Sequence, residues 1–140
     1  MLLQFQLLHA DARLPAFGSS GAAGMDFYAI EHGGHVAGTV TKVPLGLAVE
    51  VPLFHALLIT SRSSYGANYG AGVPHGYGLI DSDYRGELFM VFRSEKHFKW
   101  EKGDRIAQGL LVQAPRVDIV RVNSVTPTAR GAGAFGSTGA

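Results

Sequence analysis

Apolar and polar residues alternate with a period of two along most of this chain, and this alternation constrains the fold more than any other feature. The alternating runs are residues 3–7, 25–29, 45–51, 88–92 and 117–122. Residues 88–92 are apolar on both faces, which predicts one face in the core and a second that is buried or lies in an interface. Because successive side chains of a strand point to opposite faces, we expect many short strands.

Glycine and proline divide the chain into short segments. The 140 residues include 19 glycines and 6 prolines, and the prolines stand at or near the ends of the alternating runs, where a missing backbone donor is tolerated. The longest stretch free of both, residues 87–102, begins as a strand and ends in a charged turn at residues 94–99. Residues 63–67 have room for a short helical turn at most. The sequence therefore predicts an all-β sandwich or barrel, and its length fits one domain.

Composition excludes several classes of protein. Twelve Lys and Arg against eleven Asp and Glu give a net charge of +1, which argues against a strongly basic nucleic-acid binder. The absence of cysteine excludes disulfides, a thiol nucleophile and a cysteine-based zinc site. No apolar run reaches the ~18–20 residues of a membrane span. Residues 1–8 are apolar but lack a basic flank, and Gln4 and Gln6 interrupt them, so we expect a strand in a soluble, cytoplasmic protein.

The last fifteen residues have the composition of a flexible tail, rich in glycine and alanine with one aromatic residue, Phe135. Residues 131–136 spell G-x-G-x-x-G, but that motif needs a helix after it, and only two residues follow Thr138. The composition of this tail nevertheless suits an anionic ligand. Arg130 supplies a positive charge, the hydroxyls supply hydrogen-bond donors, and Phe135 offers a flat face on which a base could stack. The alternative is a tail without a ligand that Phe135 anchors to the core.

Two internal segments combine charge, hydroxyls and glycine. Arg62, followed by two serines, suits phosphate oxygens, and Asp81 and Asp83 would share one face of a strand, where one of them could activate a water. The alternative is a polar hairpin with turn-forming side chains. In residues 102–108, Asp104 and Arg105 predict a structural pair, and Gln108 alternates with Ile106 and would point into a polar pocket.

Histidines carry little signal. His32 and His35 flank two glycines, but no third ligand lies nearby, so a surface turn is expected rather than a metal site.

Taken in order, five segments closely resemble the five sequence motifs of the homotrimeric dUTPases. They are residues 22–29, 61–64, 78–88, 103–108 and 130–139. One such segment would be weak support, but five in the same order and spacing are highly specific, and together they extend over nearly the whole chain.

The resemblance implies a jelly-roll-like β fold and a homotrimer that hydrolyses dUTP to dUMP and pyrophosphate with Mg²⁺. It implies a β-barrel domain over residues 1–125 and a C-terminal arm over residues 126–140 that closes a neighbouring active site, built between subunits. It implies no nucleic-acid or membrane partner. We expect the protein in the cytoplasm, or in the nucleus, or, if its source is viral, in the host cell.

The resemblance also assigns roles to residues. Asp81 would orient and activate the water that attacks the α-phosphorus, and Asp26 would reach magnesium through the ion's bound waters. The expected substrate-binding residues are Arg62, Ser63, Ser64, His75, Gly78, Leu79, Ile80, Tyr84, Phe89, Gln108, Arg130, Phe135, Gly136, Ser137 and Thr138.

Within that set, Arg62, its two following serines and Gln108 would hold phosphate oxygens. The hairpin of residues 75–80 would read the uracil edge, and Tyr84 would lie under the deoxyribose and exclude a 2′-hydroxyl. Phe135 would stack on uracil while the rest of the arm closes on the phosphates.

Four positions depart from the family pattern. Met25 stands where a tyrosine, leucine or phenylalanine is common, and we expect a core substitution of little consequence. His75 stands where some bacterial members have an asparagine that contacts uracil; a histidine can still donate and accept hydrogen bonds there, and it opens a route to pH-dependent uracil binding. Ala134 replaces a glycine, and a left-handed backbone there would strain the closed arm. Gly109 after Gln108 is unusual and has no explanation in the sequence.

Two other functions compete. A dCTP deaminase shares the Arg-Ser-Ser segment but needs a glutamate where this chain has Val91. A non-catalytic binding module would be favoured by loss of the water-orienting aspartate, the arm arginine or the stacking aromatic, and Asp81, Arg130 and Phe135 are all present.

Overall fold

The computed structural model describes residues 1–134, which form eleven strands and one helix. The elements are β1 (Gln4–Leu7), β2 (Ala16–Phe17), β3 (Met25–Tyr28), β4 (Gly33–His35), β5 (Val40–Pro44), β6 (Leu47–Glu50), β7 (His55–Ser61), α1 (Ser63–Tyr69), β8 (Gly78–Ile80), β9 (Phe89–Arg93), β10 (Phe98–Trp100) and β11 (Arg105–Gln113). The predicted all-β class is confirmed. Within residues 1–134, no helix is long and apolar enough to cross a membrane.

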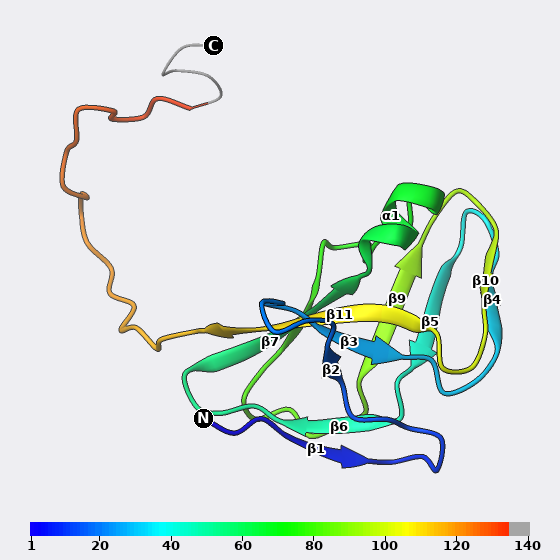
Figure 1. Cartoon of the computed structure of the whole chain (residues 1–140). Coiled ribbons are helices and arrows are strands. Elements are labelled where there is room, and N and C mark those ends of the chain that lie inside the picture. The colour runs from blue at the N-terminus through cyan, green and yellow to red at the C-terminus, as the bar shows by residue number, and fades with distance from the viewer. Residues whose placement is uncertain (135–140) are drawn as a thin grey trace.

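The strands form four antiparallel sheets around one core. The largest has the order β2-β3-β11-β7-β8, and the pairs β1-β6, β4-β10 and β5-β9 complete the body. β11 lies between β3 and β7, and α1 follows β7 directly at the edge of the body (Figure 1). Segments that are far apart in the sequence therefore meet at the end of this central strand.

The core confirms the predicted faces of residues 88–92. Leu88, Met90 and Phe92 are fully buried, whereas the intervening Phe89 and Val91 are only partly buried. Full burial of a side chain of this size contributes about 1.5–3 kcal/mol. The same alternation that predicts the strand therefore also predicts which of its side chains contribute most to stability.

Gly109 finds its explanation in this core. A Cβ at this position of β11 would lie 2.5 Å from Cε2 of Phe27 and 3.2 Å from Cδ1 of Leu57. The side chains of Phe27 and Leu57 are both fully buried, so neither has free space to move into. Glycine here makes room for the Phe27 ring.

Two predicted elements differ from the structure. The strand predicted over residues 117–122 is absent: β11 ends at Gln113, and the chain then leaves the body as an extended segment (Figure 1). Its apolar side chains are exposed, Val117 by 69% and Ile119 by 94%. A strand needs a hydrogen-bonding neighbour, and the described part of this single chain provides none.

The predicted short turn at residues 63–67 is a longer helix. α1 continues to Tyr69 and stops at Gly70, whose left-handed backbone (φ 61°) donates its N–H to the carbonyl of Gly66. The helix forms because Tyr65 packs its ring against Phe92 and Phe98 in the core. Tertiary packing, which local propensity does not reveal, adds the second turn.

Candidate active site

A buried carboxylate lies at the centre of the candidate site. Asp26 on β3 is only 3% exposed. One carboxylate oxygen lies 3.0 Å from Nε of Arg62 in an ion pair and accepts a hydrogen bond from Nε2 of Gln108 at 3.2 Å. The other accepts from Nη1 of Arg105 at 3.3 Å. Two cations and an amide therefore surround one anion, which leaves a net positive cluster.

A β-bulge explains how two residues of β11 reach the same carboxylate. Arg105 and Gln108 are three positions apart, so in a regular strand they would point to opposite faces. The register shifts between Arg105, which pairs with Tyr28, and Ala107, which pairs with Phe27, so that Gln108 pairs with Asp26. The extra residue turns both side chains toward one face. The predicted pairing of Arg105 with Asp104 is wrong, because Arg105 binds Asp26 and Asp104 accepts the N–H of Glu101.

Arg62 and the two serines that follow it stand where β7 meets α1. Arg62 has an extended backbone and precedes the first helical residue, Ser63. Beside them lies a polar cavity of about 340 Å³. Its walls are formed by Arg62, Ser64, Tyr65, Asn68, Tyr69, Lys99, Asp104 and Arg105. Burial, with a contribution from the charge of Asp104, raises the pKa of the Tyr65 phenol, so this wall presents a neutral hydroxyl. The cavity has the charge and the donors to hold an anion.

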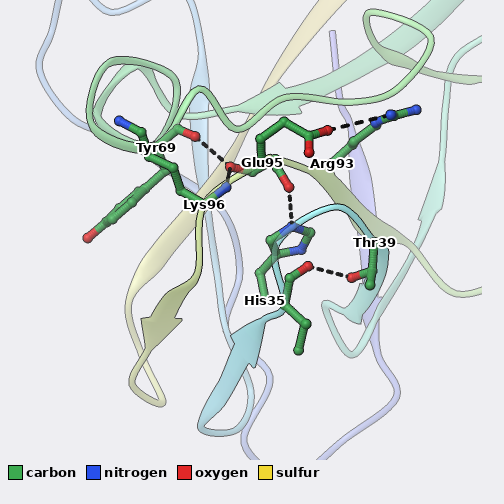
Figure 2. A network of polar contacts seen from close by, with 8 residues as sticks. His35, Thr39, Tyr69, Arg93, Glu95 and Lys96 are labelled. Carbon is green, nitrogen blue, oxygen red and sulfur yellow. Dashed lines mark hydrogen bonds and ion pairs between the residues drawn. The ribbon is translucent and has the colours of Figure 1, made fainter.

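The far end of α1 is held by the turn between β9 and β10 (Figure 2). The Ser94 hydroxyl donates to the carbonyl of Tyr69, the last helical residue, and accepts from the N–H of Lys96 at 3.0 Å. The Ser94 carbonyl accepts from Nε2 of His35 at 3.0 Å. Nζ of Lys96 donates to the Asn68 carbonyl at 3.2 Å. Ser94 and His35 are buried. This clamp fixes the helix that carries the serines at its other end.

The histidines do not form the surface turn that was expected. His35 lies on β4, is only 2% exposed and stacks on Phe98, while His32 is exposed and contacts Glu101. Among residues 1–134, no group of three or more His, Asp or Glu could hold a metal ion.

Asp81 lies far from the Asp26 cluster within one chain. It follows Ile80 of β8, which pairs with Leu57 in an antiparallel register, so Asp81 lies level with Ala56. Arg62 is six residues beyond Ala56, just past the end of β7. At about 3.3 Å per residue, Asp81 and Arg62 are separated by about 20 Å along the strand direction. Asp81 instead lines a separate cavity of about 470 Å³ with His55 and Arg116. One copy of the chain does not bring the two predicted halves of the site together.

The family comparison decides between the open alternatives. The dUTPase family model matches residues 10–139. The chain belongs to the dUTPase family. It is 33% identical over 141 residues to the deoxyuridine 5′-triphosphate nucleotidohydrolase of Helicobacter pylori strain Shi470, with 99% of this chain and 97% of that protein covered. It is 39% identical over 135 residues to the nucleotidohydrolase of the same name from Anaplasma marginale, with coverage of 90% and 88%.

The fold agrees with that membership. A variant of the dUTPase of Staphylococcus bacteriophage 80alpha, solved with dUpNHpp, superposes with a TM-score of 0.89 at 24% identity and covers 99% of each chain. This similarity confirms the jelly-roll-like β fold. The dCTP deaminase alternative is not supported, and Val91, in place of the required glutamate, lies partly buried on β9 of this dUTPase.

The remaining predicted residues of this dUTPase lie at several places. His75 precedes β8, which is Gly78–Ile80, and the neighbouring Gly76 and Tyr77 line a largely apolar cavity of about 390 Å³ together with Gln108. Tyr84 donates its hydroxyl to the Glu87 carbonyl at 2.9 Å.

Besides Asp81, two more predicted residues lie away from the Asp26 cluster. Phe89 is on β9 in a different sheet, with Nζ of Lys42 3.7 Å from its ring centre. Arg130 is exposed on the extended segment, and its Nε donates to the Gly133 carbonyl at 3.0 Å. Phe135, Gly136, Ser137 and Thr138 lie outside the described residues.

Proposed function

We propose that this chain hydrolyses dUTP to dUMP and pyrophosphate by water attack on the α-phosphorus, at sites assembled from several copies of the chain. Family membership makes it a dUTP nucleotidohydrolase, and one observation supports the location of the phosphate site. Asp26 holds Arg62, Arg105 and Gln108 in fixed positions beside a polar cavity. A preorganised cationic site of this kind stabilises phosphate charge without reorganisation during the reaction.

Asp26 leaves Arg62 able to bind a second anion. The guanidinium pairs with Asp26 through Nε, without hydrogen-bond geometry, and lines the polar cavity. Guanidinium forks bind phosphate oxygens in pairs. Ser63 and Ser64 supply hydroxyl donors at the same corner, where the clamp on α1 limits their motion. We assign these three residues and Gln108 to the triphosphate.

Several copies of the chain are required because the water-activating carboxylate is remote in a single one. Asp81 is about 20 Å from Arg62 along the strand direction, so the Asp81 of another copy must complete each site. Exposed apolar side chains on residues 117–125 and around a cavity of about 640 Å³ near the N-terminus offer surface for such contacts. We propose a homotrimer in which residues 1–125 form the body and residues 126–140 form an arm over a neighbouring site.

The residues present do not fit the expected contact between Asp26 and a magnesium ion. Both carboxylate oxygens of Asp26 are already engaged by Arg and Gln donors, and the described chain has no cluster of metal ligands. In this proposal Asp26 is a positioning residue for Arg62, Arg105 and Gln108. Any Mg²⁺ is bound by the triphosphate, which suits an ion that keeps most of its waters.

Pyrophosphate release tests this proposal directly. Release from dUTP is measured beside dCTP, dTTP and UTP, with and without Mg²⁺, and the oligomer's mass is measured by light scattering. Rapid release from dUTP alone by a trimer is the expected result. Tight dUTP binding without release would instead support the non-catalytic binding module, and release from an active monomer would refute the shared site.

A further inference from the structure

Lys99 is a cation at the phosphate cavity that neither the sequence motifs nor the family resemblance assigns. It lies on β10 between Phe98 and Trp100, each only 5% exposed. Because side chains alternate along a strand, Lys99 points away from the core, and it forms part of the wall of the 340 Å³ cavity with Arg62 and Arg105.

No protein group neutralises Lys99 within the described residues. Its partner across the β4–β10 ladder is Gly34, which carries no charge, and none of the ion pairs formed by residues 1–134 includes it. Asp104, the acidic residue in the cavity wall, already accepts a hydrogen bond from the Glu101 N–H at 2.8 Å.

The cavity therefore carries an excess of positive charge. Arg62, Lys99 and Arg105 face one space, and Asp26 and Asp104 offset two of the three charges. Like charges gathered around one space repel each other, and a bound anion relieves that repulsion. The polar, cationic walls suit a phosphate group better than a base.

Positive charge increases from the largely apolar cavity to the cationic one, and this direction indicates which phosphate of the substrate lies beside Lys99. Gln108 lines the largely apolar cavity, Arg62 lines the cationic one, and both contact Asp26 between them. Lys99 contributes to the cationic cavity alone. Along dUTP, negative charge increases from the nucleoside toward the terminal phosphate in the same way.

We propose that Lys99 binds the terminal phosphate of the substrate and the pyrophosphate released from it. This inference rests on the proposed function, because it assumes a triphosphate at Arg62. It makes Lys99 a determinant of triphosphate over monophosphate recognition, and it places pyrophosphate release partly under the control of this side chain.

The test compares Lys99→Met with Lys102→Met in the full-length protein. Lys102 lies three residues away and pairs with Asp11 outside the cavity, so its variant removes the same charge without touching the site. The probes are dUpNHpp, inorganic pyrophosphate and dUMP, with binding measured by calorimetry in one Mg²⁺ buffer. Lys99→Met should weaken the binding of dUpNHpp and of pyrophosphate by about tenfold, as loss of one charge-assisted hydrogen bond predicts. The dissociation constant for dUMP should stay within about twofold of the wild-type value. Lys102→Met should leave all three unchanged, and Lys99→Arg should restore most of the loss.

Two outcomes would overturn the proposal. If Lys99→Met weakened dUMP binding as much as dUpNHpp binding, Lys99 would support the whole site rather than the part that holds the terminal phosphate. Unchanged pyrophosphate binding in Lys99→Met would show that the cavity does not take this anion. Failure of the wild type to hydrolyse dUTP would refute the proposed function by itself, whereas the three binding constants still decide the role of Lys99.

Discussion

Replacing Gly109 by alanine tests whether this glycine is required by packing rather than by backbone conformation. The added Cβ would lie 2.5 Å from Cε2 of Phe27, well inside van der Waals contact, and its backbone is not left-handed. Overpacking of this kind costs typically about 1–3 kcal/mol. Loss of glycine's freedom in the unfolded chain returns about 0.4–1 kcal/mol. We therefore expect Gly109→Ala to lower the free energy of unfolding by about 1–2 kcal/mol.

Urea unfolding at one fixed protein concentration measures this difference, because oligomer stability depends on concentration. Gly24→Ala is the matched control: its Cβ would lie 3.7 Å from the nearest atom, the Gly109 carbonyl oxygen, which is ordinary contact. Phe27→Leu, which shortens the side chain that Gly109 accommodates, should make a second substitution at Gly109 less costly than it is alone. A neutral Gly109→Ala, or strict additivity with Phe27→Leu, would refute the packing argument.

Three further outcomes concern the site. Asp81→Asn should reduce turnover by a factor on the order of 10² or more and leave dUpNHpp binding nearly intact; unchanged turnover in a steady-state assay would remove Asp81 from the mechanism. Deletion of residues 129–140 should spare folding and trimer formation, judged by circular dichroism and light scattering, but abolish efficient hydrolysis; loss of the trimer would make the arm structural. Ser94→Ala removes the donor to the Tyr69 carbonyl at the end of α1 and should lower the free energy of unfolding by about 1–3 kcal/mol while raising KM for dUTP more than it changes kcat. Unfolding and kinetics indistinguishable from those of Ser20→Ala, a control at an exposed turn residue, would contradict the clamp.

Much of the strand pattern could be predicted from the sequence. In residues 88–92, alternation identifies both the strand and its core face, because a period of two follows from strand geometry alone. Arg62 and Gln108, which we propose to bind phosphate, could also be singled out from the sequence, because their residue types and the order of the motifs indicate that chemistry. The roles of Gly109 and Arg105 could not be predicted in this way, because each depends on a side chain of another strand. Gly109 makes room for the Phe27 ring, and Arg105 binds the Asp26 carboxylate.

The candidate site depends on tertiary features that local sequence does not encode. Arg105 and Gln108 share a face only because a bulge shifts the register of β11 against β3, and spacing in a regular strand predicts the opposite. Lys99 looks like an ordinary outward residue until the β4–β10 pair brings it to the cavity beside Arg62. Residues 117–122 have a strand's pattern but no partner in the described chain, so pattern alone cannot make a strand there.

By itself, the sequence determined the class of fold, the family and the residue types available for binding phosphate, because periodicity and motif order are properties of the chain alone. Only the tertiary structure decided that Asp26 is an internal counter-ion rather than a free carboxylate, and that Asp81 is remote from Arg62 in one copy. The physical reason is that burial, register and charge pairing depend on segments far apart in the chain, and they exist only once those segments pack together.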